Sequence, residues 1–126
     1  MLARMKWQTK RREDLAMTGY YVLSKTEDER FVFTLYASHF EIALVSDPFP
    51  TKALALDEIE LMRTHGTNAA NYQRGTSGPG DPYFLIEDAE CDVIACSELH
   101  ACNATMERAI QRVIKSASAK TIKDLT

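Results

Sequence analysis

The sequence lacks an apolar run long enough to cross a membrane, and it has few cysteines. No stretch approaches the roughly eighteen consecutive apolar residues of a membrane helix. Cys91, Cys96 and Cys102 are an odd number of thiols in a short segment, which argues against a disulfide framework. No apolar run follows the basic start, so a secretory signal peptide is not indicated either. We therefore predict a cytoplasmic protein that does not enter a membrane.

Glycine and proline are also scarce, with five and four residues, and they are concentrated in one segment. Residues 75–82, GTSGPGDP, contain three of the glycines and two of the prolines. A phosphate-binding loop would need a strand before it, a helix after it and a Lys-Ser/Thr step or a G-x-G-x-x-G pattern. A strand, residues 83–87, is predicted to follow instead, so we interpret the segment as a turn between strands.

The composition indicates a single compact domain, because 45% of the 126 residues are hydrophobic and 26% are charged. The net charge of −3 is unevenly distributed. Residues 1–18 carry five basic and two acidic side chains, and residues 108–126 carry five basic and one acidic. Residues 19–107 between them carry five basic and fifteen acidic side chains. Basic ends can bind an anionic partner such as nucleic acid, although solvated charge at chain ends is the commoner explanation.

Residues 1–18 keep no clean helical stripe and are predicted to be a leader outside the domain. Met17 stands just before Gly19 and is a candidate for the true start. The functional alternative is a basic arm on which Trp7 stacks against nucleic acid.

The pattern of a folded domain begins at Gly19. Residues 20–25 and 30–37 alternate as two strands of a hairpin, and residues 41–46 form a third strand that two prolines stop. Thr51 can cap a helix whose apolar positions, including Ile59 and Met62, recur three and four residues apart. We expect this helix to end at His65-Gly66, because glycine tolerates left-handed backbone geometry.

A degenerate copy of this unit follows 51 positions downstream. Residues 41–62, EIALVSDPFPTKALALDEIELM, align without a gap on residues 92–113, DVIACSELHACNATMERAIQRV, so Ile59 matches Ile110. We predict an α+β fold of two tandem βββα repeats, residues 20–64 and 71–115, within one domain spanning residues 19–126. Its two helices would pack on one antiparallel sheet about a pseudo-twofold axis. The tail after residue 115 would add a short strand or stay loose.

Candidate chemistry is sparse. Cys91, Cys96, His100 and Cys102 are spaced C-x4-C-x3-H-x-C, unlike the two-plus-two pattern of structural zinc. In the 51-residue alignment Cys96 matches Val45, which suggests a small core residue. Cys102 matches Thr51, which suggests a residue at the cap of the second helix. His39 or His100 could activate a thiol, but nothing in the sequence positions either of them. Three carboxylates on the first helix could serve acid-base or metal chemistry, but they are expected to face solvent: Asp57, Glu58 and Glu60. We expect no metal, cofactor or catalytic residue.

Residues 41–53, EIALVSDPFPTKA, and 92–98, DVIACSE, carry a resemblance to a known family. From Gly19 to its end the chain resembles the YegP-like family of small uncharacterised proteins. The resemblance implies three antiparallel strands followed by a helix, often present twice, and it supplies no activity or cofactor. The chain departs from the family pattern at residues 38–40 and 89–91, where Asn-Gly is usual, and at residues 102–104, where Ser/Thr-Lys-Ala is usual.

We therefore predict a non-catalytic interaction or scaffold module, with a nucleic-acid-associated protein and an unrecognised enzyme as alternatives. Strand alternation leaves one sheet face opposite the helices. This face would meet a protein partner, a second copy of the chain, or the leader. Its predicted residues are Val32, Thr34, Tyr36, Tyr83 and Leu85.

Overall fold

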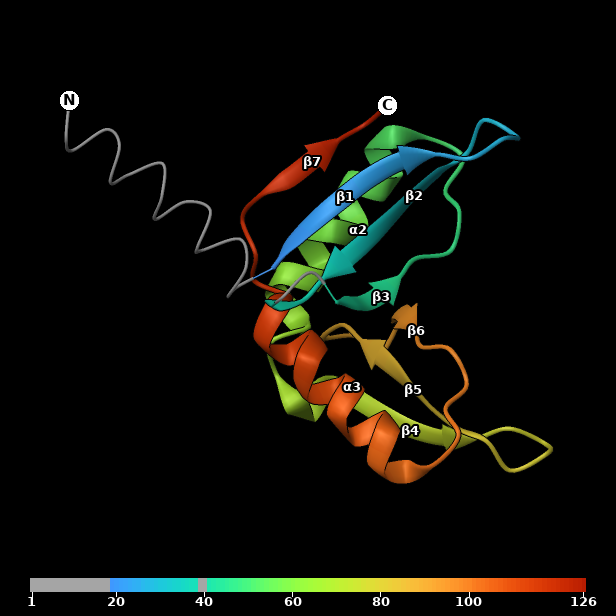
Figure 1. Ribbon diagram of the computed structural model, residues 1–126. Coiled ribbons are helices and arrows are strands. Elements are labelled where there is room, and N and C mark those ends of the chain that lie inside the picture. The colour runs from blue at the N-terminus through green and yellow to red at the C-terminus, as the bar shows by residue number, and fades with distance from the viewer. Residues whose placement is uncertain (1–18, 39–40) are drawn as a thin grey trace, which may run out of the picture.

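The computed structural model describes residues 19–38 and 41–126 (Figure 1). The leader with Trp7, and His39, lie outside these residues. The elements, in chain order, are β1 (Tyr20–Lys25), β2 (Phe31–Tyr36), β3 (Ile42–Val45), α2 (Lys52–His65), the short 3-10 helix η2 (Ala69–Asn71), β4 (Tyr72–Thr76), β5 (Pro82–Glu87), β6 (Val93–Cys96), α3 (Asn103–Ser116) and β7 (Ile122–Asp124). The chain is therefore α+β, as predicted.

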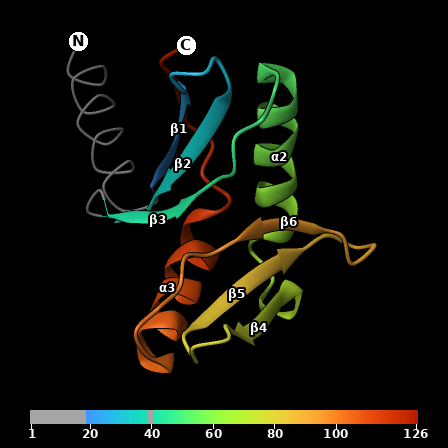
Figure 2. The same ribbon diagram turned by 90° about the vertical axis from the view of Figure 1, so that its right-hand side faces the viewer.

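The strands form two sheets, so the prediction of one sheet is wrong. One sheet has the order β3-β2-β1-β7 and the other the order β4-β5-β6. The edge strands β3 and β6 come together in the middle of the molecule (Figures 1 and 2). Both pairings that end in these strands contain a register shift, at Leu35/Tyr36 and at Ile86/Glu87. Bulges of this kind bend and twist a strand, which works against one continuous ladder across the middle.

The element bounds recur at a fixed distance along the chain. Adding 51 to the bounds of β2, β3 and α2 yields those of β5, β6 and α3. Each helix contacts both sheets: α2 packs on β2 and β6, and α3 packs on β3, β5 and β2. The molecule therefore has one core rather than two.

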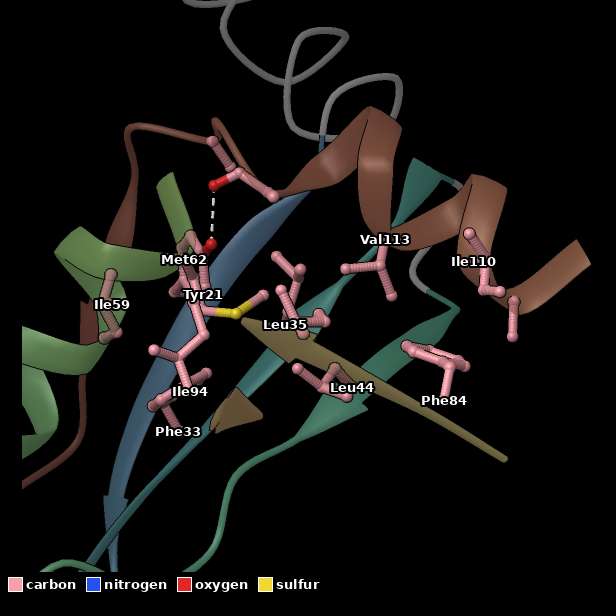
Figure 3. Close-up of a cluster of buried hydrophobic side chains, with 14 of the residues drawn as sticks. Tyr21, Phe33, Leu35, Leu44, Ile59, Met62, Phe84, Ile94, Ile110 and Val113 are labelled. Atoms are coloured by element: carbon pink, nitrogen blue, oxygen red, sulfur yellow. Dashed lines mark hydrogen bonds between the residues drawn. The ribbon is translucent and has the colours of Figure 1, made fainter. Parts of the chain in front are cut away.

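The core lies between the helices and the two sheets (Figure 3). Ile59 and Ile110, which the 51-residue offset matches, are 0% and 1% exposed. The other fully buried large side chains come from both sheets and both helices: Tyr21, Leu23, Phe33, Leu35, Met62, Phe84, Ile86 and Val113. Ile59 and Met62, which the helical spacing predicts to face inward, are thus buried.

The tail forms an additional strand. β7 pairs with β1 in parallel, with Tyr21 opposite Ile122, so this sheet is mixed rather than wholly antiparallel. An ion pair between Lys52, the first residue of α2, and Asp124 of β7 joins the tail to the helix.

Two buried tyrosines tie each helix end to the other half of the chain. The Tyr21 hydroxyl donates to the Ala117 carbonyl at 2.6 Å, and the Tyr72 hydroxyl donates to the Gly66 carbonyl at 2.7 Å; the first bond is dashed in Figure 3. The helix ends at His65 with Gly66 as its C-cap, and Gly66 has a φ of −71°, so it does not use the left-handed geometry that glycine tolerates. Glycine is needed there because a Cβ would lie 2.6 Å from the Met62 carbonyl oxygen.

Candidate functional site

The structure places the five predicted face residues on the central strands of the two sheets. Val32, Thr34 and Tyr36 lie on β2, and Tyr83 and Leu85 lie on β5. All five are half-buried and alternate with fully buried residues of the core. Because neighbouring side chains on a strand point to opposite faces, these five point away from the core.

Edge strand β3 adds two exposed apolar residues to this face. Tyr36 pairs with Ile42 and Thr34 with Val45 across the bulge. Ile42 is 54% exposed and Val45 is 53% exposed. Simple alternation would place Ile42 on the same side as the buried Leu44. The bulge turns Ile42 outward, which is why strand periodicity could not identify it.

The other edge strand, β6, repeats the arrangement. Leu85 pairs with Cys96, and Glu87 pairs with Val93, which is 54% exposed. We use the term outer face for the residues, all but Thr34 apolar or aromatic, that these pairings set opposite the core: Val32, Thr34, Tyr36, Ile42, Val45, Tyr83, Leu85 and Val93. The most exposed members lie on β3 and β6, where the two sheets come together.

Aromatic contacts border the outer face. Tyr36 stacks on Tyr20, with ring centroids 5.1 Å apart, and the Lys123 ammonium lies 5.1 Å from the centroid of the Tyr20 ring. Tyr83 lies across Gly75 of the neighbouring strand, where an added Cβ would come within 2.6 Å of the tyrosine ring. Gly75 thus leaves room for the Tyr83 ring within β4, rather than belonging to the loop that the sequence indicated.

The cysteine and histidine cluster is not assembled into a metal site. Cys91, Cys96 and Cys102 are exposed and unpaired, whereas His100 is 9% exposed. Within residues 19–38 and 41–126, no group of three or more His, Cys, Asp or Glu side chains is placed to hold a metal ion. The assignment of Cys96 to the core is wrong, because Cys96 and its match Val45 both lie on the exposed side of their strands.

The pKa values of Cys96 and Cys102 are shifted in opposite directions. Partial burial, and then the charge of Asp47, raises the pKa of Cys96, so its reactive thiolate is disfavoured. Cys102 is the N-cap of α3, and its sulfur lies 3.1 Å from the Thr105 hydroxyl. That hydrogen bond is the main cause that lowers the pKa of Cys102.

A cavity of about 120 Å³ opens between β3, α3 and the segment that follows β6. It is lined by Ile42, Ala43, Leu44, Val45, Phe84, Cys96, Ser97, Glu98, His100, Ala109 and Arg112. His100 stacks on Phe84, with ring centroids 6.2 Å apart. Its Nε2 is buried and is the one such side-chain nitrogen or oxygen in the described part of the chain without a hydrogen-bond partner. The cavity therefore brings together His100 and Cys96, two of the residues considered for chemistry.

The three α2 carboxylates do not form a site. Asp57 and Glu60 are exposed, and Glu60 pairs with Arg63. Glu58 is half-buried, and its pKa is raised first by burial and then by the nearby charges of Asp88 and Asp57. It lines a second cavity of about 170 Å³ beside β6.

Comparison with known proteins places this arrangement in a family. No family model matches the chain. A UPF0339 protein from Shewanella oneidensis is 32% identical over 110 residues, which cover 87% of this chain and 100% of that protein. A UPF0339 protein from Bordetella pertussis is 33% identical over 110 residues, which cover 87% of this chain and 98% of that protein. The UPF0339 protein YegP of Escherichia coli O157:H7 is 31% identical over the same length, covering 87% of this chain and all of YegP. The chain belongs to the UPF0339 family.

Solved structures of UPF0339 proteins have the same fold. The solution structure of SO3888 from Shewanella oneidensis matches with a TM-score of 0.79 and 32% identity, over 87% of this chain and 93% of that one. The solution structure of YegP from E. coli, described as a protein of unknown function, matches with a TM-score of 0.78 and 30% identity, over 87% and 95%. The resemblance to the YegP-like family is thereby confirmed.

No helix within residues 19–38 and 41–126 combines the length and the apolar character needed to cross a membrane.

Proposed function

We propose that this UPF0339 protein is a non-catalytic interaction module that binds a partner protein through its outer face. The observation that carries the proposal is the exposure of Ile42, Val45 and Val93, each more than half exposed, where the two sheets come together. Apolar surface collected in one place is more often a contact surface than an accident. Tyr36 and Tyr83 flank it and supply the aromatic groups that are enriched at binding hot spots.

The raised pKa of Cys96 supports a non-catalytic role. Its thiol shares a cavity with His100, which is the arrangement that the enzyme alternative requires. Burial raises the pKa of this thiol, whereas an activated cysteine nucleophile has a lowered pKa. The three exposed, unpaired thiols are in keeping with a reducing cytoplasm.

We also infer that the fold is a duplicated βββα unit with a pseudo-twofold axis between β3 and β6. The two tyrosine hydroxyl bonds support this. Tyr72 stands 51 positions after Tyr21, and Ala117 stands 51 positions after Gly66. In one bond the first half donates to the second, and in the other the second half donates to the first. The cavities support it as well, because every residue around the cavity at β6 lies 51 positions from a residue around the cavity at β3. Such an axis would bring the exposed residues of both halves to one place on the outer face.

The proposal is tested with paired substitutions on the outer face. V45S/V93S removes apolar surface at its centre, where both side chains are already more than half exposed, so the fold should survive. L125S is the matched control, because Leu125 is 69% exposed but lies outside the face. Each variant and the native protein are used to capture partners from native lysate, followed by direct binding measurements with the purified partner.

The expected result is a partner that binds the native protein and L125S alike and binds V45S/V93S at least about tenfold more weakly, for a contact that contributes at least about 1.4 kcal/mol. Size measurements by light scattering accompany the capture. A native dimer that V45S/V93S converts to a monomer would replace the partner with a second copy of the chain. Equal capture by all three proteins would overturn the role of the outer face.

Nucleic-acid binding is the second candidate, and the position of β7 favours it. Ile122 pairs with Tyr21, and Lys123 covers Tyr20, so basic residues of the tail lie where the leader joins β1. Salt-dependent binding of single-stranded nucleic acid that is lost on removing residues 1–16 would support this candidate. Binding that neither salt nor the removal changes would count against it.

A further inference from the structure

We propose that the cavity between β3 and α3 binds a small organic carboxylate, with the anion held by His100 and Arg112. The proposal does not depend on the proposed interaction with a partner, although Ile42 and Val45 of the outer face also line the cavity. It rests on the lining of the cavity, on the buried state of His100 and on a comparison with the positions 51 residues away.

His100 is the observation that points to a ligand. Its side chain lines the cavity and is nine-tenths buried, yet its Nε2 has no partner within residues 19–38 and 41–126. A buried nitrogen without a hydrogen bond costs free energy, so its presence calls for a partner that the protein itself does not supply. Its flat ring already packs on Phe84, and its backbone N–H donates to the Pro82 carbonyl at 2.8 Å.

Packing alone does not require histidine at this place. The residue 51 positions earlier is Phe49, which stacks on Phe33 at 6.3 Å, much as His100 stacks on Phe84 at 6.2 Å. A phenyl ring therefore performs the same packing without a nitrogen. Arg112 likewise stands 51 positions after Leu61. Both hydrogen-bond donors of the proposed site thus replace apolar residues of the other half.

The two cavities consequently differ in charge. The cavity at β6 contains Asp47 and Glu58 and has Phe49 in place of the imidazole. The cavity at β3 contains the imidazole and a guanidinium, with Glu98 as its acidic residue. Arg112 is paired with Glu41 through one nitrogen at 3.2 Å, and a guanidinium has five N–H donors, so it has donors left for a carboxylate.

The remaining lining sets the size and shape of the ligand. The Ser97 hydroxyl is already occupied, since it accepts from the Phe84 N–H and donates to the Glu98 carbonyl. Leu44, Val45 and Ala109 present apolar surface. A cavity of about 150 Å³ is known to hold benzene, so 120 Å³ suits a molecule with no more non-hydrogen atoms than benzene has. A short alkyl chain with one carboxylate, such as butyrate, meets both requirements.

The test uses the full chain, isotopically labelled, with butyrate as the probe in a nuclear magnetic resonance titration. Butyramide is the matched neutral probe, because it has the same number of non-hydrogen atoms and no charge. H100F and R112L introduce the residue types found 51 positions earlier, Phe49 and Leu61. Both variants therefore use side chains that already pack at the matching positions of the other half. K115L is the control for charge, since Lys115 is an exposed cation on the same helix outside the cavity.

We expect saturable shifts of the His100 ring and of the Leu44 and Ala109 methyl groups with butyrate. Affinity should fall at least about tenfold for butyramide, for H100F and for R112L, because each change removes a charge-assisted hydrogen bond. K115L should bind as the native protein does. The absence of saturable shifts, equal affinity for butyramide, or native affinity in H100F or R112L would overturn the proposal. If H100F fails to fold, the result for R112L decides between the outcomes. The Arg112 side chain is 35% exposed, so replacing it leaves the core unchanged.

Discussion

Removing the hydroxyl of Tyr21 or of Tyr72 should destabilise the protein by similar amounts. The bonds are 2.6 and 2.7 Å long and end on the carbonyls of Ala117 and Gly66, both of which are buried. Substitution by phenylalanine leaves each carbonyl without that donor in a site that water does not reach. A buried acceptor left in this way costs about 1–3 kcal/mol. For a chain of this length, 1 kcal/mol corresponds to a melting-temperature change of about 4 °C.

The assay is urea unfolding of Y21F and Y72F followed by circular dichroism, with the free energy of unfolding taken from the midpoint and the slope. Y36F is the matched control: Tyr36 is half-buried on the outer face, and its loss of a hydroxyl should change stability by less than about 0.5 kcal/mol. A Y21F midpoint equal to that of Y36F would show that the bond to Ala117 does not hold the halves together. A large cost for one tyrosine and none for the other would contradict the equivalence of the two sites.

The remaining predictions concern pH, the core, the leader and the cysteines. Burial raises the pKa of both Tyr21 and Tyr72 above the ordinary value of 10.0, so the folded state keeps their protons more tightly. The free energy of unfolding that this difference contributes should therefore be fully present below pH 10 and be lost as the pH rises above it. The loss should be less steep in Y21F and Y72F. Urea midpoints measured at increasing pH test this. I59A and I110A should each cost about 2–5 kcal/mol in chemical unfolding, because both side chains are buried; a cost below 1 kcal/mol at either position would contradict its place in the core. A chain beginning at Met17 should melt at nearly the native temperature, and a large drop would show that the leader docks on the domain. Elemental analysis of protein purified without chelator should find no bound zinc, and a stoichiometric amount would direct attention to the cysteines and His100.

The exposed part of the outer face could not be read from strand periodicity. Alternation correctly identifies Phe33 and Leu35 as core residues, because β2 is regular and one of its sides is buried. It fails at Ile42, which lies on an edge strand at a bulge, because one additional residue reverses which side the next side chain faces. The core assignment of Cys96 rested instead on its match to Val45, and both residues lie on the exposed side of their strands.

The site at His100 was visible in the sequence only in part. The 51-residue register already shows a histidine where the other copy has Phe49. What the register could not show is that Nε2 is buried without a partner, or that Arg112 of α3 and β3 line the same cavity. These facts depend on how two segments distant in the chain pack together.

The sequence by itself determined the order of strands and helices, most of the core and the family, because periodicity, capping and a fixed offset act over short stretches of chain. The tertiary structure decided that there are two sheets, that β7 lies parallel to β1, and that each helix end receives a tyrosine hydroxyl from the other half. Strand pairing and buried hydrogen bonds join residues far apart in the chain, and they depend on backbone bulges and on the space left between packed elements. No local pattern of residue types contains that information.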